Sequence, residues 1–344
     1  MVEKAKRHRS RAISPLTGSL MMIVLVLLLA AVSAGLFLDY SGELDESVTT
    51  YDPDACPGFQ EVEFSAGGGS FEEFLQELTD NNCALWLKSE NFESDGGTAV
   101  RWNDEGPNEF DAKQDDTSHA PQIKRDSVLG IDVLKFQADH SSLDQNDNDP
   151  DPGSTDGDYL SIDRNIDQLG VDEDSGLVVV ALLKVDNFDR GGTWTIGKAG
   201  EDGKEFSMRT CGNYDFDGCQ SSDTEGEWRA QHWGTADVDF DSGDESAGNW
   251  MVLTHEYDGS EVTIRVNGQE VAKDSVDLDL STNRDIQIGR WVRLNDDPHY
   301  YFDGRMAEII IFDRRLADSE LETVEEYLSD EYGVSLDGPI GDTD

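Results

Sequence analysis

Alternation of apolar and polar residues dominates the chain after residue 84 and predicts β-strands. Two alternating runs, 251–257 and 262–266, end at Asp258-Gly259 and Asn267-Gly268. DG and NG pairs between such runs are strong signals of tight hairpins. Further apolar strand candidates are 178–185, 194–197, 206–209, 286–289 and 306–312. The pattern therefore predicts an antiparallel, mainly β domain in which each strand buries one face.

Helical spacing appears near the C-terminus. Ser319 and Glu322 have the spacing of a capping box. The apolar stripe that follows consists of Leu321, Val324 and Leu328. We expect one short helix after the last strand.

The N-terminal segment has a different pattern, because it carries an uncharged apolar run of 19 residues, 20–38, behind a basic head. The basic residues are Lys4, Lys6, Arg7, Arg9 and Arg11. Nineteen residues of helix extend about 28 Å, which suffices to cross a bilayer. We predict a basic leader at 1–12 and a hydrophobic membrane or filament-core helix at 13–38, so the rest of the chain is exported or anchored.

Three fates of this segment stay open. Cleavage between Ala34 and Gly35 would release a secreted protein, and no cleavage would leave a membrane anchor with its positive head inside. The third fate rests on residues 11–18, Arg-Ala-Ile-Ser-Pro-Leu-Thr-Gly, which resemble the class III signal peptide of haloarchaeal type IV pilins. That resemblance implies cleavage between Ala12 and Ile13 and a retained helix that packs with copies of itself in a filament.

The net charge indicates in which solvent the protein works and which partners it can bind. The chain has 26 Lys+Arg against 74 Asp+Glu, a formal net charge of −48. Such charge repels itself unless salt shortens the Debye length from roughly 30 Å to about 3 Å. This composition resembles that of halophilic proteins. It also argues against nucleic-acid partners, since phosphates would be repelled.

The four cysteines predict disulfides in an exported chain. Cys211 and Cys219 enclose a segment of hairpin-tip length. Cys56 and Cys83 bracket a strand-like segment, 59–65, and a helix that begins near Ser70. We assign 39–83 to a stalk or linker with this short strand and helix. Other pairings stay possible, and the spacings do not suit zinc.

Several segments resemble the laminin G, or concanavalin A-like lectin/glucanase, family. These are Ala-Leu-Trp-Leu at 84–87, Val-Arg-Trp-Asn-Asp at 100–104, Asp-Tyr-Leu-Ser-Ile at 158–162, 262–271, and the closing run 288–312 with its following helix. The resemblance implies an antiparallel two-sheet jelly-roll sandwich at 84–335, followed by a tail at 336–344. With the N-terminal hydrophobic α-helix and the short C-terminal helix, this completes the predicted fold.

An enzyme on this fold is the alternative to a binding module. Laminarinase-type glycosidases carry a Glu-x-Asp-x-x-Glu motif on one strand, which sets two carboxylates about 5 Å apart. The single match in this chain, 256–261, runs across the predicted Asp258-Gly259 turn and so does not lie along one strand. The alternating acids are better explained as solvated strand faces; they are Asp237, Asp239, Asp241, Asp277 and Asp279. We therefore expect no catalytic residues.

An acidic stretch offers a candidate calcium loop. Asp147, Asp149 and Asp151 are spaced two apart, and Asp158 is the twelfth residue from the first of them. Pro152 stands where an EF-hand loop needs glycine. We therefore expect a calcium-stiffened loop rather than an EF-hand, with a solvated acidic loop as the alternative.

Aromatic side chains near amides and carboxylates are the natural candidates for carbohydrate binding. The best group precedes the last strand and comprises Trp291, Asn295, Asp296, His299 and Tyr300; a second group is His232 and Trp233. We expect them to lie exposed on rim loops. Trp86, Trp102, Trp194 and Trp250 fit strand or framework patterns and are expected in the core.

These features together predict a lectin-like adhesion or recognition protein at the surface of a halophile. It would be anchored by its N-terminal helix or assembled in a pilus with other pilin subunits. Its partner would be a carbohydrate or a surface glycoconjugate, and calcium is the one cofactor indicated. A secreted or anchored glycoside-active enzyme is the alternative.

Overall fold

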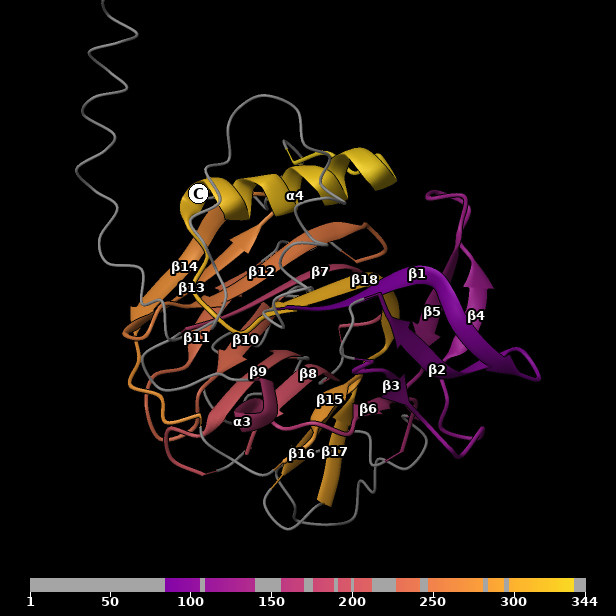
Figure 1. Cartoon of the computed structure of the whole chain (residues 1–344), viewed down its shortest axis with the longest axis horizontal. Coiled ribbons are helices and arrows are strands. Elements are labelled where there is room, and N and C mark those ends of the chain that lie inside the picture. Colours follow the sequence, from indigo (N-terminus) through magenta and orange to yellow (C-terminus); the bar gives the residue numbers. More distant parts are fainter. Residues whose placement is uncertain are drawn as a thin grey trace, which may run out of the picture. The chain divides into compact units, whose positions relative to one another are not determined.

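A computed structural model of the chain describes residues 84–105, 109–139, 156–169, 176–188, 191–198, 201–211, 227–241, 247–280, 284–293 and 297–336. All of them belong to the unit 53–344, and their strands and helices are coloured along the sequence in Figure 1. The predicted leader, hydrophobic helix, stalk and C-terminal tail beyond residue 336 lie outside the described residues. Within the described part, no helix has the length and apolarity needed to span a bilayer.

Strands make up most of the described chain, and they alternate with short turns. They are β1 (Ala84–Asp95), β2 (Thr98–Asp104), β3 (Ala112–Lys113), β4 (Gln122–Arg125), β5 (Asp132–Phe136), β6 (Leu160–Ile162), β7 (Leu177–Val185), β8 (Gly191–Gly197), β9 (Glu205–Thr210), β10 (Glu227–Gln231), β11 (Val238–Asp241), β12 (Met251–Tyr257), β13 (Glu261–Val266), β14 (Gln269–Ser275), β15 (Ile286–Ile288), β16 (Arg290–Arg293), β17 (Asp297–Tyr301) and β18 (Gly304–Phe312). The helices are α3 (Ile166–Leu169) and α4 (Asp318–Tyr332).

Most of the strands form two runs of paired neighbours, while the hairpins β4–β5 and β16–β17 join these runs through β18 and β8. The first run has the order β1-β18-β7-β12-β13-β14, and every pairing in it is antiparallel. The second has the order β2-β3-β6-β15-β8-β9-β10-β11, again antiparallel throughout. Pairing of β1 with β2 joins the runs. The mainly β prediction is confirmed, whereas a separation into two jelly-roll sheets stays a prediction.

Both predicted hairpins form in the first run. The turn from β12 to β13 contains Asp258, whose carboxylate accepts the N–H groups of Ser260 (2.9 Å) and Glu261 (2.8 Å). The turn from β13 to β14 places Asn267 and Gly268 at φ of 49° and 76°. Two consecutive left-handed residues match the twist of the flanking strands, which explains the NG pair.

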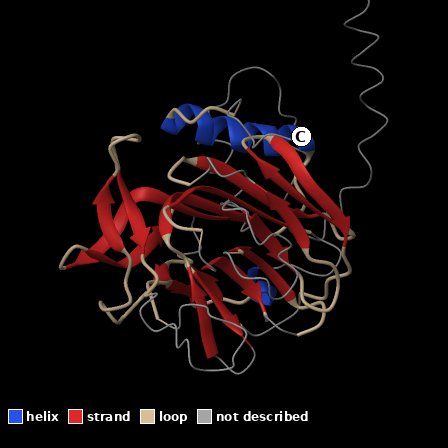
Figure 2. Cartoon of the chain, turned by 180° about the vertical axis from the view of Figure 1, so that it is seen from behind, coloured by secondary structure: helices blue, strands red, loops and turns tan. Residues whose placement is uncertain are grey.

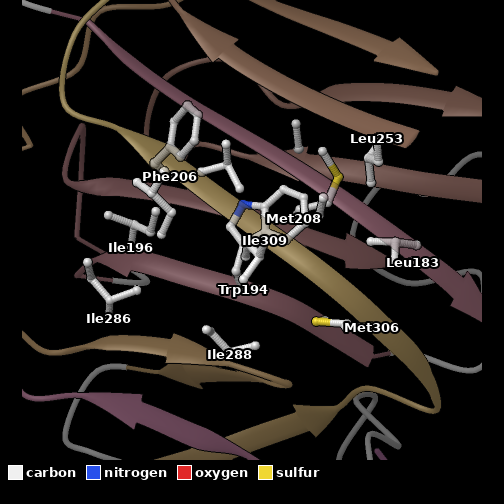
Figure 3. Packing of buried hydrophobic residues seen from close by; sticks show 14 of the residues in the cluster. Leu183, Trp194, Ile196, Phe206, Met208, Leu253, Ile286, Ile288, Met306 and Ile309 are labelled. Atoms are coloured by element: carbon white, nitrogen blue, oxygen red, sulfur yellow. The ribbon is translucent and has the colours of Figure 1, made fainter. Parts of the chain in front are cut away.

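Apolar side chains from both runs meet in one core. Trp194, Phe206 and Met208 of the second run pack against Leu183, Leu253 and Ile309 of the first, as Figure 3 shows. Trp102, Trp194 and Trp228 are fully buried, and Trp86 and Trp250 are 8% exposed. Four of these tryptophans were expected in the core, so that expectation is confirmed.

The other face of the first run is covered by α4 (Figure 2). Its residues Leu321, Val324 and Leu328 are buried against alternate residues of β7 and β18, as the apolar stripe predicts. The centre of the run is therefore buried on both faces, and β7 is buried at all nine positions, whereas the edge strand β14 is largely exposed. Strands covered on both sides need near-continuous apolar sequence rather than alternation.

The predicted capping box at Ser319 and Glu322 is wrong by two residues. The helix begins at Asp318, with Ala317 at the N-cap, and Glu320 accepts the Ala317 N–H at 2.8 Å. Arg314 donates to both oxygens of the same carboxylate at 2.9 and 3.0 Å. This pairing, which joins residues across a turn, positions Glu320 and so fixes where the helix starts.

Buried carboxylates anchor α4 to the sheet. Glu308 on β18 accepts the indole N–H of Trp86 (2.5 Å) and the hydroxyl of Tyr332 on α4. Burial raises the pKa of Glu308 to about 7 against these hydrogen bonds, which lower it. Glu325 of α4 accepts the Thr254 hydroxyl (2.8 Å) and the Arg265 guanidinium (3.0 Å).

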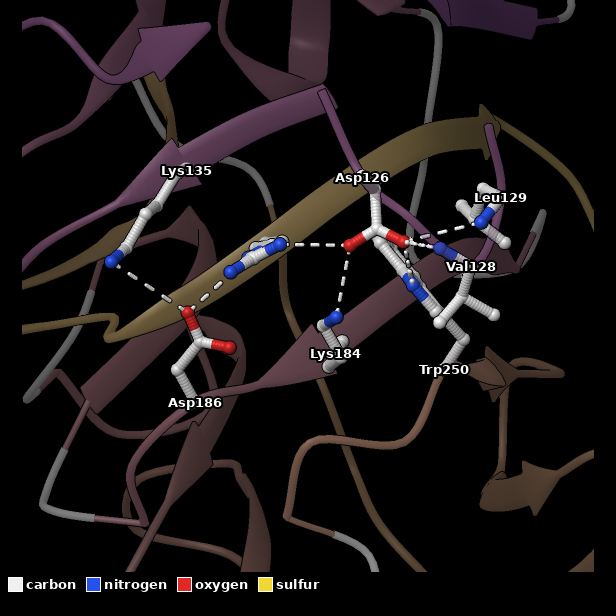
Figure 4. A network of polar contacts seen from close by, with 8 residues as sticks. Asp126, Val128, Leu129, Lys135, Lys184, Asp186 and Trp250 are labelled. Atoms are coloured by element: carbon white, nitrogen blue, oxygen red, sulfur yellow. Dashed lines mark hydrogen bonds and ion pairs between the residues drawn. The ribbon is translucent and has the colours of Figure 1, made fainter. Parts of the chain in front are cut away.

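Asp126, in the turn between β4 and β5, joins three other segments (Figure 4). Its carboxylate, 1% exposed, accepts Lys184 Nζ of β7 (3.0 Å), Arg305 Nη1 of β18 (2.8 Å) and the indole N–H of Trp250 (3.2 Å). Burial alone would raise the pKa of Asp126, but the Lys184 bond and two backbone N–H groups outweigh it and lower the pKa. The charge is therefore fixed in place.

We predict that Asp126→Asn lowers the free energy of unfolding by about 3–5 kcal/mol, because it leaves Lys184, whose side chain is 8% exposed, without its buried counter-charge. Urea unfolding monitored by circular dichroism measures the change. Asp132→Asn is the matched control, since Asp132 pairs with Arg125 at the surface (3.7 Å) and should change stability by about 0.5 kcal/mol or less. Equal effects of the two substitutions would contradict the assignment.

The raised pKa of Glu308 predicts a pH-dependent effect. Glu308 is protonated more readily in the folded chain than in the unfolded one, so its contribution to stability is present below pH 4.5 and is lost as the pH rises through about 7. Relative to wild type, Glu308→Gln should gain stability between pH 4.5 and 7, by about 1.4 kcal/mol per pH unit.

The measurement is urea unfolding at pH 5 and pH 8 for both proteins. Glu331→Gln is the control, because Glu331 is half exposed and pairs only at 3.7 Å with Lys88. A Glu308→Gln difference that is the same at both pH values would refute the assignment.

Candidate functional site

Two of the predicted ligand residues come together, but they are buried rather than exposed on a rim loop. Trp291 on β16 stacks on Tyr300 on β17 with ring centroids 5.3 Å apart, and the two residues are 2% and 1% exposed. Their hairpin lies directly against β8, where a Cβ on Gly192 would be 2.2 Å from the Trp291 nitrogen. Only glycine permits this approach, and it brings the aromatic pair onto the sheet.

The other members of that predicted group are only partly described. His299 pairs with Trp291 along the hairpin, and its side chain lies outside the described residues. Asn295 and Asp296 also lie outside them. The structure therefore joins Trp291 to Tyr300 and leaves the role of the remaining three residues a prediction.

Charged side chains surround the aromatic pair. The Trp291 indole N–H donates to Glu205 Oε1 (2.5 Å), and Arg209 lies over both rings at 5.8 and 5.7 Å from their centroids. Both charged residues are on β9, and both are at most 2% exposed. An arginine over an aromatic face is favourable because the ring quadrupole is negative there.

The face of the second run that points away from the core carries a continuous line of polar residues. Cross-strand partners follow one another from β2 to β10, and we call this set the polar row. Its members are Arg101, Lys113, Ser161, Gln287, Thr195, Ser207 and Gln231. Such an array of hydroxyl, amide and cationic groups can form many hydrogen bonds with a polyhydroxylated ligand.

One end of the polar row is accessible. Arg101, Lys113 and Ser161 are partly exposed, as are Tyr159 and Arg290 beside them. The Arg290 guanidinium lies 3.3 Å from the centroid of the Tyr159 ring, and its Nε donates to Gln287 Oε1 (3.0 Å). Here a partly exposed aromatic ring and polar side chains lie at one surface.

The other end of the polar row is buried and incompletely hydrogen bonded. Ser207 is fully buried and Gln231 is 3% exposed. Ser207 Oγ, Gln231 Oε1 and the nearby Thr193 Oγ1 have no hydrogen-bond partner in the part of the chain that the structure describes. Buried polar groups without partners cost free energy, so they call for a functional or solvent-related explanation.

The second predicted group separates onto two faces. Trp233 is 37% exposed in the turn after β10, where its carbonyl accepts the Gly203 N–H (2.7 Å). His232 beside it is fully buried and points into the core, where its Nε2 lies 3.1 Å from Nε2 of His255. Trp233 therefore lies where a ligand could reach it, and His232 does not.

Asp158 is the one predicted calcium ligand that the structure describes. It is 8% exposed and accepts the Gln137 N–H at 3.0 Å, and burial raises its pKa to about 7. Asp147, Asp149 and Asp151 lie outside the described residues. Elsewhere in the described ranges, no three His, Cys, Asp or Glu side chains gather as metal ligands would. The calcium loop stays a prediction.

The alternating acids lie as solvated faces where they are described. Asp237, Asp239, Asp277 and Asp279 are exposed, and the side chain of Asp241 lies outside the described residues. Asp239 pairs with Arg229 through two hydrogen bonds of 2.7 Å. Of the cysteines, Cys211 is disulfide-bonded, whereas Cys56, Cys83 and Cys219 lie outside the described part of the chain.

The polar row was missed at the level of sequence, although a signal was present. Ser207 and Arg209 alternate with Phe206 and Met208 in a segment recognised as a strand. Alternation identifies the outward residues of one strand, but it does not identify their cross-strand neighbours on other strands. Those neighbours depend on the pairing register of the strands.

Residues 156–322 match the family model of the concanavalin A-like lectin/glucanases superfamily. No curated protein matches the chain. The strands β6 to β18 lie within the matched segment, whereas β1 to β5 precede it.

Solved structures resemble the chain at low identity. They include Trypanosoma rangeli sialidase in complex with the inhibitor DANA (14% identity, 70% of this chain and 32% of that chain covered, TM-score 0.41). The binding domain of Paraclostridial Mosquitocidal Protein 1 has 12% identity, 75% and 56% coverage, and a TM-score of 0.45. The receptor binding domain of botulinum neurotoxin C/D mosaic serotype has 13% identity, 72% and 52% coverage, and a TM-score of 0.44.

The chain thus spans between 32% and 56% of the length of these proteins. Likeness at this level transfers no activity, because function resides in sites rather than in folds. The match to the family model is what identifies the domain. Residues 156–322 form a concanavalin A-like lectin/glucanase domain, which contains the polar row from Ser161 to Gln231.

Proposed function

We propose that the protein is a lectin-like recognition protein whose carbohydrate ligand binds at the accessible end of the polar row. The observation that carries this proposal is the combination of Ser161 and Lys113 with the Tyr159–Arg290 stack on one partly exposed face. Sugar rings are bound by aromatic faces together with a few well-placed polar groups. The polar row offers both.

The buried end supports the same proposal. Within the described residues, Ser207 Oγ and Gln231 Oε1 have no hydrogen-bond partner, and Ser207 is on β9 with Arg209, which lies over the stacked aromatic pair. A ligand or ordered water that reached this end would satisfy them. The initial contact, however, is proposed at the accessible end, where no rearrangement is needed.

We further propose that the protein acts at the cell surface of a halophile. Support comes from the sequence: the apolar segment 20–38, the net charge of −48 and the resemblance of residues 11–18 to a pilin processing site. A two-sheet sandwich displayed by a retained helix, on a membrane or in a filament, suits adhesion to glycoconjugates.

A binding role rather than catalysis fits the carboxylates of the site. Glu205 is occupied by the Trp291 indole, and Asp239 is occupied by Arg229. A retaining glycosidase needs two carboxyl groups free to act on one glycosidic bond. We therefore propose that the protein does not hydrolyse glycosides, and glycoside-active function is the alternative.

The first test of this proposal is Tyr159→Ala. Removing the ring should weaken glycan binding at least tenfold, because the flat contact surface is lost, while the midpoint of thermal unfolding falls only modestly for this partly exposed residue. Glycan-array screening of the wild type identifies a ligand, and isothermal titration calorimetry in molar KCl measures the affinity of both proteins.

Lysine substitutions provide the matched pair for that test. Lys113→Ala, in the polar row, should also weaken binding, whereas Lys273→Ala, on β14 of the first run, should not. If Tyr159→Ala and Lys113→Ala bind as the wild type does, the ligand does not bind at this end of the polar row.

The position of N-terminal cleavage tests whether a retained helix holds the protein at the cell surface. We expect the native protein to begin at Ile13 and to appear in filaments sheared from cells. Mass spectrometry of the native N-terminus measures this directly. A start at Gly35 would mean a secreted protein, and an uncleaved start would mean a simple anchor, so either result contradicts pilin-like processing.

Calcium is proposed as a ligand of the acidic loop that ends at Asp158. Titration calorimetry in molar KCl should show calcium binding that is lost when Asp147, Asp149 and Asp151 are changed together to Asn. Absence of heat with chelator-treated wild type would identify a solvated loop instead. The carbohydrate proposal does not depend on this result, since the polar row contains none of these residues.

A further inference from the structure

Two histidines form a hydrogen-bonded pair inside the core. His255 belongs to β12 of the first run, and His232 directly follows β10 of the second. Their Nε2 atoms lie 3.1 Å apart, and both residues are fully buried. Phe206 stacks on the His255 ring at 3.6 Å with an angle of 9° between the planes. The pair is thus a polar contact between the two runs, in an apolar setting.

The hydrogen bonds fix the number of protons on the pair. His232 Nδ1 lies 3.1 Å from the carbonyl oxygen of Ala236, which can only accept, so Nδ1 carries a proton. In a neutral ring, His232 Nε2 is then an acceptor, and His255 Nε2 must donate to it. His255 Nδ1 is left as a lone pair, and it has no partner in the described chain. Two protons therefore complete the arrangement.

A third proton has no favourable position. A proton on His232 Nε2 would face the N–H of His255 Nε2, and two donors cannot hydrogen bond to each other. The hydrogen bond between the two runs would then be lost. A proton on His255 Nδ1 would create a cation with nothing to accept the new N–H. Either position places an uncompensated charge in the core, which is costly.

The described neighbours of the His255 ring are uncharged. Within β12 and its neighbours, His255 faces Val179 of β7 and Ile264 of β13 as cross-strand partners. Trp194 of β8 and Phe206 of β9 are the aromatic neighbours of its ring.

Asp237, a carboxylate that contacts the His232 backbone, is already engaged. Asp237 accepts the backbone N–H of His232 at 3.2 Å and pairs with Arg229 at 3.2 Å. Glu256, adjacent in sequence, points to the opposite face of β12 because side chains alternate along a strand. Neither of these two described carboxylates is therefore placed to stabilise an imidazolium ion.

The two sides of the pair differ in how firmly they are held. His255 sits in β12, which pairs along its length with both β7 and β13. His232 begins the turn 232–237, which links β10 to β11 and is exposed at Trp233, Gly234 and Thr235. A disruption of the pair would therefore move the turn before it moves β12.

We propose that the His232–His255 pair is an acid-sensitive lock, which holds the turn 232–237 and its exposed Trp233 against the core and releases it when the pair gains a third proton. The lock itself is independent of carbohydrate binding. Its effect on ligand contact through Trp233 rests on the proposed function, since Trp233 is the exposed aromatic residue of this turn.

Burial lowers the pKa of His232 to about 4 and that of His255 well below its ordinary value of 6.5. The unfolded or released state therefore binds protons more readily than the locked state. The stability contributed by the neutral pair is complete above pH 6.5 and decreases as the pH falls toward 4. This direction agrees with release in acid.

The experiment is hydrogen exchange of the full chain in detergent and molar KCl, followed by mass spectrometry and corrected for the intrinsic pH dependence of exchange. At pH 7 the peptide that covers 232–237 should be protected. At pH 4.5 its protection should fall at least tenfold, while peptides of β12 keep theirs. Loss of protection in β12 at the same pH would mean global unfolding and would overturn the proposal.

Substitutions separate the pair from the many carboxylates that also titrate in acid. His232→Gln keeps a side-chain acceptor for the His255 N–H but removes one of the two titrating rings, so the acid-induced fall in the protection of 232–237 should become much smaller. His119→Gln is the control, because His119 is half exposed and pairs with surface Asp116 (3.1 Å). If His119→Gln removes the pH dependence, or wild type shows none, the lock is wrong.

These results do not depend on a glycan, so failure of the proposed function would leave them unaffected. Should His232→Gln not fold, the wild-type pH series and His119→Gln still decide the question. Where a glycan ligand is known, a fall in its affinity between pH 7 and pH 4.5 that Trp233→Ala abolishes would link the lock to recognition.

Discussion

Burial of the centre of the first run, β7 and β18, on both faces is the constraint on which the rest of this structure depends. Alternate residues of β7 face the common core and the helix α4, and the strand has no solvent-facing side. Each buried aliphatic side chain contributes roughly 1.5–3 kcal/mol relative to its exposed state. The second run must cover one face, and α4 must cover the other.

Polar contacts then determine how those layers are placed. Asp126 links the turn after β4 to β7 and β18, while Glu308 and Glu325 link the sheet to α4. Such contacts add little net stability compared with an apolar replacement, but breaking one partner is costly. They therefore select one arrangement among several that would bury similar apolar area.

The second run has a different design, because its outward face is polar. Its inward side chains complete the core. The outward side chains can therefore be polar without weakening that core. The hairpin β16–β17 covers part of this face through Gly192, and it brings Trp291 and Tyr300 over Arg209. The same run contributes His232 to the contact with β12, so a group in the core and an exposed aromatic are neighbours in one turn.

The sequence by itself determined the mainly β class, both hairpin turns and the buried stripe of α4, because alternation, NG or DG pairs and helical spacing are local patterns. It also identified Trp291 and Tyr300 as neighbours. It failed on their exposure and on the helix cap, since the close approach at Gly192 and the Arg314–Glu320 pairing appear only when distant or folded-back segments meet. The polar row and the His232–His255 pair were decided by the tertiary structure alone. Both require the register of separate strands, and a register is set by long-range burial that no local pattern contains.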